Sequence, residues 1–177
     1  MDGKGLVHIY TGEGKGKTTA AIGLGIRACG SGMKVMMVQF LKSGNTSELH
    51  SIARLQPDFC ITRGYSAKKF TWNMDEEELA QAAKEAAEIF EGVKATVMSE
   101  KYDLVILDEL LGVLSLKFLE EAQVVGLIKN KPEAVELVLT GRNAPEALIE
   151  AADYVSEIKA LKHPYEKGIK ARKGIEY

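Results

Sequence analysis

Cysteine is scarce in this sequence, and neither sign of charge is in strong excess. These two features argue against a cysteine-based metal site and against a highly charged binding protein. The chain has two cysteines and a formal net charge of −2. Cys29 and Cys60 do not have the spacing of metal ligands, so we expect free thiols in a reducing cytosol. The small net charge gives no general reason to expect a nucleic acid or a membrane surface as a partner.

Long apolar runs and the familiar sets of catalytic residues are also missing. No apolar stretch approaches the ~20 residues that cross a bilayer. The N-terminus has no basic-then-apolar stretch of the kind found in signal peptides, so we expect a cytoplasmic location. No Ser-His-Asp arrangement and no clustered His/Cys metal site is visible. If the protein is an enzyme, its chemistry must come from another kind of motif.

That motif is a glycine-rich segment near the N-terminus. An apolar run at 6–10 is followed by a turn ending in Gly-Lys-Thr and then by a helix of small residues. This order is typical of a phosphate-binding loop, because glycines bring backbone N–H groups close to phosphate oxygens and the helix N-terminus adds positive charge. Lys17 adds a full charge, and the Thr18 hydroxyl can bind Mg²⁺. The predicted nucleotide-binding residues of the loop are Thr11, Gly12, Glu13, Gly14, Lys15, Gly16, Lys17, Thr18 and Thr19.

The match to the strict phosphate-loop pattern has one exception. The pattern places a glycine five residues before Gly16, and this sequence has Thr11 there. A chance glycine-rich turn after a strand is the alternative. The flanking strand and helix favour the phosphate loop.

Short apolar runs alternate with amphipathic stretches along the whole chain, as in repeated βαβ units. We expect strands at 6–10, 34–40, 58–62, 104–107, 135–139 and 154–158, and helices at 17–29, 74–99, 116–129 and 144–151. The fold expected is α/β, a three-layer P-loop NTPase of RecA-like type with a mostly parallel central sheet. Residues 1–177 would form a single nucleotide-binding domain with a basic tail at 159–177, whose local charge is +4.

Two further signals follow apolar strands. Asp108 and Glu109 come directly after the run at 104–107, at the sheet edge where parallel sheets bind ligands, and could hold Mg²⁺. Thr140 and Arg142 follow the strand at 135–139 and suit phosphate or ribose contacts. The alternative for Asp108 and Glu109 is a strand that ends in two solvated acids. The alternative for Thr140 and Arg142 is a loop without a ligand-binding role. Gln39, Phe40 and Lys42 could also face the crevice, with weak support from spacing alone, and His50 is left unassigned.

These motifs, with others, make the sequence similar to the ATP:corrinoid adenosyltransferases of the CobA/CobO/BtuR type, over nearly the whole chain. The Thr in place of the first glycine is shared with that family. The residues that carry the resemblance are the loop at 10–21, Val38-Gln39-Phe40-Leu41-Lys42, Phe70-Thr71-Trp72, Leu107-Asp108-Glu109-Leu110, Leu139-Thr140-Gly141-Arg142, Lys162-His163-Pro164-Tyr165, the segment at 168–171 and Gly174-Ile175-Glu176-Tyr177.

The resemblance implies transfer of the 5′-deoxyadenosyl group of ATP to the Co(I) of a corrinoid, with release of triphosphate. Lys17, Thr18 and Glu109 would be the catalytic residues, and Thr18 and Glu109, with Asp108 nearby, would handle Mg²⁺. It further implies that Arg27 lies near the nucleoside, that an electron-donating reductase is a partner, and that the protein is a homodimer. Phe70 and Trp72 would pack against the lower face of the corrinoid; the alternative is an anchor for an irregular segment.

Two departures from the family pattern remain. The segment between Gly64 and Phe70 is longer than in many members, which leaves its register open. Only residues 1–5 precede the first strand, where some relatives carry a helical extension over the active site.

Two other functions stay open: a RecA-like ATPase in which Glu109 activates water, and a non-catalytic carrier of corrinoid or nucleotide.

Overall fold

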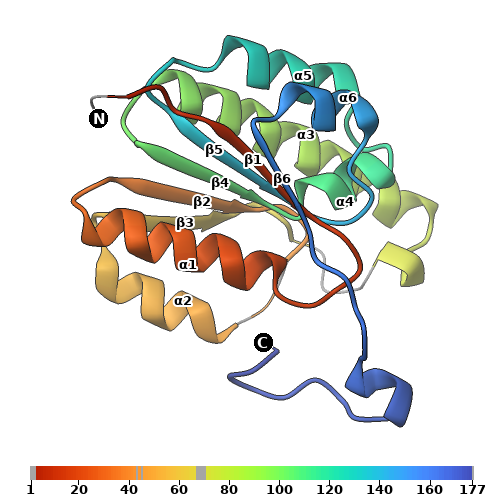
Figure 1. Ribbon diagram of the computed structural model, residues 1–177. Helices are drawn as coiled ribbons and strands as arrows, with labels where there is room; N and C mark the ends of the chain where they lie inside the picture. The colour runs from red at the N-terminus through yellow and green to blue at the C-terminus, as the bar shows by residue number, and fades with distance from the viewer. Residues whose placement is uncertain (1–2, 43, 45, 67–70, 177) are drawn as a thin grey trace.

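The computed structural model describes residues 3–42, 44, 46–66 and 71–176, with only the backbone of Trp72. The predicted aromatic Phe70 therefore lies outside the described residues. The described chain contains a six-stranded sheet in the order β3-β2-β4-β5-β1-β6, and every neighbouring pair of strands is parallel (Figure 1). This confirms the predicted α/β class.

The strands lie within one residue of their predicted positions at each end. They are β1 (Val7–Thr11), β2 (Val35–Gln39), β3 (Phe59–Arg63), β4 (Leu104–Asp108), β5 (Glu136–Thr140) and β6 (Tyr154–Glu157). The α-helices are α1 (Lys17–Gly30), α2 (Ser47–Ile52), α3 (Glu76–Met98), α4 (Leu110–Ser115), α5 (Glu121–Asn130) and α6 (Glu146–Ala151), with short 3₁₀ turns at Ala53–Leu55, Thr71–Asn73 and Pro164–Lys167.

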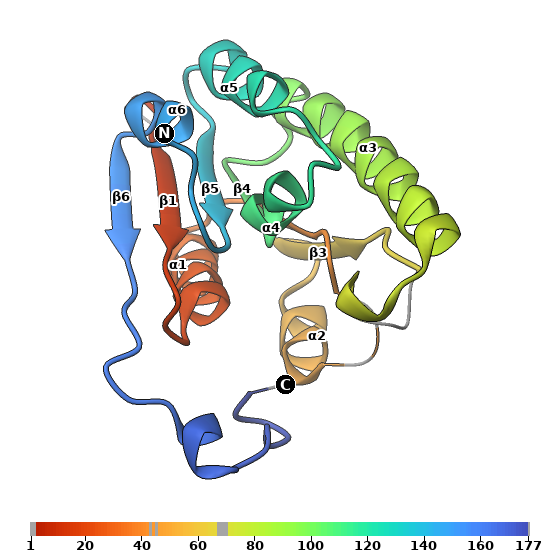
Figure 2. The same ribbon diagram turned by 90° about the vertical axis from the view of Figure 1, so that its right-hand side faces the viewer.

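Helices cover both faces of the sheet, which gives the predicted three layers. Figures 1 and 2 show α1 and α2 on one face and α3, α4, α5 and α6 on the other. Each interface has its own apolar core: Met37, Phe59 and Ile106 lie under α1, and on the opposite face Val105 and Leu107 belong to one cluster with Phe90 of α3. β4 is buried on both faces, as its unbroken apolar run predicts.

The longest helix begins where the sequence predicts. The Asp75 carboxylate accepts a hydrogen bond from the Glu78 N–H, and the Glu78 side chain accepts from the Asp75 N–H, which completes a capping box. Alanines on one face of α3 let it lie close to the sheet, because Ala82 and Ala86 are almost fully buried.

The helix predicted at 116–129 is wrong in its first part. The structure has α4 directly after Glu109, then a turn in which Lys117 is left-handed at φ 57°, and only then α5. The Glu120 carboxylate caps the first turn of α5 in a capping box with Gln123. An apolar pattern through 110–119 hides this break, because α4 is buried and the partly buried turn that follows also carries Leu116, Phe118 and Leu119.

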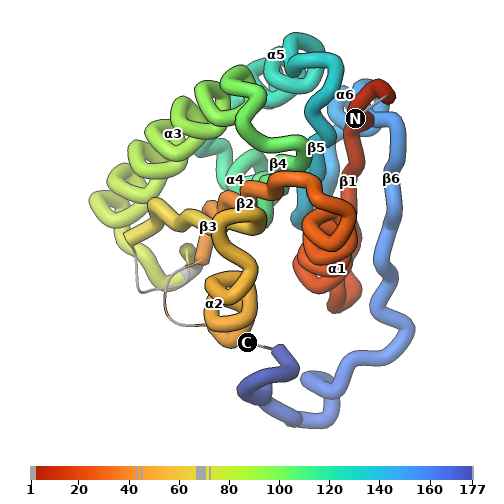
Figure 3. The backbone as a smooth tube through the Cα atoms, turned by 90° about the vertical axis from the view of Figure 1, so that its left-hand side faces the viewer, coloured from red at the N-terminus to blue at the C-terminus, as the bar shows by residue number. Residues whose placement is uncertain are grey.

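The C-terminal segment leaves the sheet after β6 and returns across the carboxyl ends of the strands. Figure 3 shows it passing below α1 and ending close to α2. Both cysteines are free, as predicted. No helix in the described part of the chain is long and apolar enough to span a membrane.

Candidate active site

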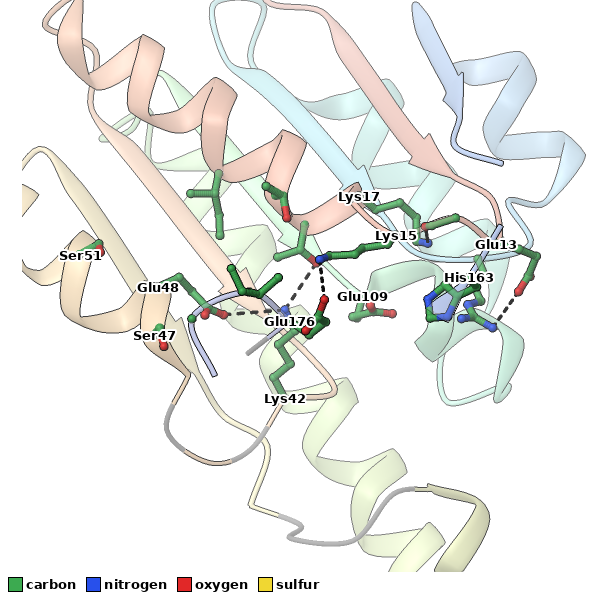
Figure 4. A pocket seen from close by; sticks show the side chains of 18 residues that line it. Glu13, Lys15, Lys17, Lys42, Ser47, Glu48, Ser51, Glu109, His163 and Glu176 are labelled. Carbon is green, nitrogen blue, oxygen red and sulfur yellow. Dashed lines mark hydrogen bonds and ion pairs between the residues drawn. The ribbon is translucent and has the colours of Figure 1, made fainter. Parts of the chain in front are cut away.

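A cleft of about 660 Å³ lies at the carboxyl edge of the sheet (Figure 4). Its walls come from the glycine-rich loop and α1, from Lys42 and α2, from Glu109 and Arg142, and from the C-terminal segment. Parallel sheets bind ligands at this edge, because several strands deliver their following loops to one place.

The loop between β1 and α1 requires glycine at three places. Gly12 and Gly16 have φ values of 102° and 121°, a region that residues with side chains rarely adopt. Gly14 passes so close to β6 that a Cβ would lie 2.7 Å from the Ile158 carbonyl oxygen, and its N–H donates to that oxygen over 2.7 Å. No side chain caps the first turn of α1, which leaves its N–H groups for an anion in the cleft.

Lys17 lies beneath this loop and is folded back upon it. Its ammonium donates to the carbonyl oxygens of Gly12 and Gly14, over 2.6 and 2.9 Å. Burial lowers the pKa of Lys17, and the carboxylate of Glu109 opposes that shift. The charge is thus held next to the cleft by two neutral acceptors, which an anionic oxygen would replace with a stronger, charge-assisted bond.

Asp108, at the end of β4, joins four neighbours. Its Oδ1 accepts from the hydroxyls of Thr18 and Thr140, each over 2.8 Å. Its Oδ2 accepts from the Gln39 amide and the Lys42 ammonium, each over 2.9 Å. The Asp108 side chain has no exposed surface, so this carboxylate fixes the relative positions of α1, β2 and β5.

Glu109 lines the cleft, as do the carboxylates of Glu13, Glu48 and Glu176. The backbone of Glu109 is left-handed, with φ 62°, and its N–H donates to the Thr140 hydroxyl over 3.0 Å. Such a conformation in a residue with a side chain costs ~1 kcal/mol or more and is common at functional sites. Burial, followed by repulsion from Asp108, raises the pKa of Glu109.

The comparisons with known proteins agree with this arrangement. Residues 3–177 match the model of a family described as "ATP:corrinoid adenosyltransferase BtuR/CobO/CobP". The chain belongs to this family.

Relatives named corrinoid adenosyltransferase match over almost the whole chain. A corrinoid adenosyltransferase of Sinorhizobium sp is 39% identical over 99% of this chain and 82% of its own length. One from Escherichia coli K12 is 35% identical, covering 100% of this chain and 88% of its own. The corrinoid adenosyltransferase CobA of Salmonella typhimurium LT2 is 33% identical, covering 98% and 86%.

Most of the predicted phosphate-binding residues line the cleft of this family member. They are Glu13, Gly14, Lys15, Gly16, Lys17, Thr18, Thr19 and Arg142, and the predicted metal ligand Glu109 lines the cleft as well. Arg142 pairs with Glu13 over 2.7 Å, and both side chains are more than half exposed. The residue before Arg142 must be glycine for the chain to pass this close to α4, because a Cβ on Gly141 would lie 2.6 Å from the Leu111 Cβ.

Two predicted ligands of the nucleotide are buried instead of facing the cleft. Thr140 has no exposed surface, and its hydroxyl serves Asp108 and Glu109. Thr11 is 8% exposed, and its hydroxyl accepts a 3.4 Å hydrogen bond from the Ala144 N–H. Both threonines act here as supports for the loops that carry the cleft residues.

Arg27 lies away from this cleft. It is exposed in the last turn of α1, ten residues after Lys17, which corresponds to about 15 Å along the helix. Its predicted place near the nucleoside stays a prediction. So do the roles of Phe70, which is not described, and Trp72, of which only the backbone is described.

The sequence did not predict most of the cleft residues that come from α2 and from the C-terminal segment. The cleft residues without a prediction are Ile22, Ser47, Glu48, Ser51, His163, Gly174, Ile175 and Glu176, while Lys42 had only weak support. Arg63, at the end of β3, positions part of the wall that α2 forms: its guanidinium bonds to the Gly44 carbonyl oxygen and the Thr46 hydroxyl, and it lies 3.4 Å from Glu48. The family signature at 162–177 was the one signal for the C-terminal residues.

The donor set suits Mg²⁺ bound together with phosphate. Thr18 and Glu109 offer oxygen ligands at the cleft. The Thr18 hydroxyl gives its proton to Asp108, and its oxygen, which lies 3.4 Å from the Lys42 ammonium, has a lone pair left for a cation. Among the described residues no three His, Cys, Asp or Glu side chains form a metal-binding group.

Proposed function

We propose that this protein transfers the 5′-deoxyadenosyl group of ATP to the Co(I) of a corrinoid, in the synthesis or salvage of adenosylcobalamin. Co(I) supplies the electron pair for the new cobalt–carbon bond and becomes formally Co(III). The bond from C5′ to its oxygen breaks, and triphosphate leaves with that electron pair. The observation that carries the proposal is a cleft lined by the glycine-rich loop and Lys17, in a chain that matches the corrinoid adenosyltransferase family over residues 3–177.

The reaction asks little proton chemistry of the protein, because Co(I) is itself a strong nucleophile. The cleft must instead hold the triphosphate, orient C5′ and neutralise the charge that develops on the leaving oxygen. Lys17 would exchange its two carbonyl acceptors for phosphate oxygens, and the N–H groups of the first turn of α1 would bind beside it.

Thr18 and Glu109 would hold Mg²⁺ on the triphosphate. The ion, when bound, neutralises phosphate charge and orients the leaving group. Asp108 would keep the Thr18 hydroxyl aimed at the ion through their 2.8 Å hydrogen bond. This arrangement supports Mg²⁺ as the cation.

The remaining predictions concern partners. An apolar surface formed by Phe70 and Trp72 would displace the lower axial ligand of cobalt and make Co(II) easier to reduce. An electron-donating reductase would supply the electron, and a second copy of the chain would form the homodimer that is common in the family. A cytoplasmic location suits these partners.

The test is an assay with the protein, MgATP and chemically reduced corrinoid, followed by the visible spectrum of the cobalt–carbon product. We expect Lys17→Ala to lower kcat/KM by about 100-fold or more, because it removes a charge from the leaving group. The exposed Lys101→Ala, at the opposite end of the sheet, should keep full activity. ATP breakdown to ADP and orthophosphate without adenosylated corrinoid would favour the RecA-like ATPase instead.

A further inference from the structure

Lys42 occupies a position in the cleft that the proposed chemistry has not used. It follows β2, whereas Lys17 follows β1, and these strands are separated in the sheet by β4 and β5. The Lys42 ammonium lies 2.9 Å from Asp108 Oδ2 and 3.4 Å from the Thr18 hydroxyl oxygen. Its side chain is 25% exposed and lines the cleft (Figure 4).

The surroundings of Asp108 explain why a cation is needed there. A buried carboxylate is costly unless it is paired and fully hydrogen-bonded. Thr18, Thr140 and Gln39 provide neutral hydrogen bonds, and Lys42 is the charge within salt-bridge distance of Asp108 in the described part of the chain.

These four partners also leave Asp108 no spare acceptor. A carboxylate has about four lone-pair sites, and each of the two oxygens of Asp108 already accepts twice. Asp108 is therefore closed to direct contact with a metal ion while Lys42 stays in place. Glu109, the next residue, still lines the cleft with its carboxylate.

The ion pair with Asp108 leaves hydrogen-bond donors of the Lys42 ammonium available. An ammonium has three donors, and its bond to Asp108 takes one. The contact with Thr18 is long at 3.4 Å, and Glu48 is 3.9 Å away. The exposed part of the side chain opens to the space in which the triphosphate would lie.

We propose that Lys42 is a phosphate-binding lysine outside the glycine-rich loop, which bridges Asp108 to an oxygen of the triphosphate on the side of Thr18 remote from that loop. This deepens the proposed function and rests on it for the identity of the substrate. A leaving group of three phosphates carries charge along its whole length. Cations at two separated points of the cleft suit such a group better than a single lysine does.

The test measures binding of inorganic triphosphate to the full chain by calorimetry, in the presence of EDTA so that no metal contributes. We expect Lys42→Met, which keeps the apolar stem, to weaken binding by about tenfold or more. Lys42→Arg keeps the charge and should stay within a few-fold of the unchanged protein, as should the control Lys101→Met.

A double variant separates phosphate binding from simple support of Asp108. Lys42→Met leaves a buried charge unpaired, and this alone could disturb the site or the fold. Lys42→Met/Asp108→Asn removes both charges, and we expect it to fold and still bind metal-free triphosphate weakly. Recovery of normal affinity in the double variant would overturn the proposal, as would normal affinity in Lys42→Met.

These outcomes are independent of the corrinoid. If the unchanged protein makes no adenosylated product but Lys42→Met still loses triphosphate affinity, the proposed function fails and the role of Lys42 in phosphate binding stands. If adenosylation proceeds and Lys42→Met binds metal-free triphosphate normally, the role of Lys42 fails alone.

Discussion

At the scale of single residues, the site depends on a few buried polar groups that hold the cleft residues in place. Asp108 is the clearest, because it connects α1, β2 and β5 through hydrogen bonds and an ion pair without any exposed surface. The sequence predicts its place at a strand end, but not its partners. The position of a strand end in the sequence predicts where its side chain leaves the sheet. The hydrogen-bond partners of that side chain depend on how strands that are far apart in the sequence pack together.

We expect Asp108→Ala to destabilise the fold by about 3 kcal/mol or more, because it leaves the Lys42 ammonium, the Gln39 amide and two hydroxyls without their acceptor. Urea unfolding followed by circular dichroism measures this. Glu88→Ala, at an exposed position on α3, is the matched control and should change stability by less than about 0.5 kcal/mol. Equal stability of the two variants would contradict the role given to Asp108.

Gly16 provides a second test at this scale. Its φ of 121° is strained for any side chain, although a Cβ would meet nothing within 4 Å. We expect Gly16→Ala to weaken MgATP binding about tenfold or more by deforming the loop, with little change in core packing. Calorimetry measures the affinity, and unaltered affinity would show that the loop conformation is not needed for binding.

At the scale of elements, patterns in the sequence predict the strands well and the helices less evenly. Apolar runs bounded by glycine or acidic residues mark the strands, and the capping box marks the start of α3. The α4–α5 break is hidden because the turn between these helices carries leucine and phenylalanine, as an amphipathic helix would. The sequence at 43–55 favours a polar loop that enters a helix, and the helix found there, α2, has six residues.

The packing of α1 gives a paired prediction from one helix. A Cβ on Gly25 would lie 2.6 Å from an atom of the Phe59 ring, whereas a Cβ on Gly23 would meet nothing within 4 Å. Gly25→Ala should destabilise the protein by ~1–3 kcal/mol through overpacking. Gly23→Ala should stabilise it by up to ~1 kcal/mol through helix propensity. Melting temperatures that move in opposite directions would bear this out, and a shared direction would refute it.

At the scale of the whole molecule, the C-terminal segment completes the cleft. Lys15 and Glu176 lie 161 positions apart in the sequence, yet their charged groups are 2.9 Å apart. Local patterns cannot predict such a contact, because its geometry depends on the path of the whole tail. The resemblance to the adenosyltransferase family marked the tail as important, and the structure brings His163 and Glu176 to the cleft. The arrangement of 1–177 as one domain stays a prediction.

The ion pair between Lys15 and Glu176 should weaken when salt is added and should not change between pH 6 and pH 8. Hydrogen bonds from Arg172 and then Lys15 lower the pKa of Glu176 to about 2. A lowered carboxyl pKa contributes stability above the unfolded value of ~4.3, and that contribution is lost only as pH falls towards 2. We expect the amide NMR signals of 174–176 to stay unchanged from pH 8 to 6 and to shift when 0.5 M NaCl is added, because the groups are exposed. A titration near neutral pH would contradict this.

The measurement that tests the central claim most directly follows the carbon and the phosphates of ATP together. ATP labelled with ¹³C at C5′ is mixed with the protein, Mg²⁺ and Co(I) corrinoid, and the products are followed by ¹³C and ³¹P NMR. The proposed reaction predicts one labelled carbon bonded to cobalt for each intact triphosphate released. Orthophosphate and ADP, with the labelled carbon still bonded to oxygen, would contradict it.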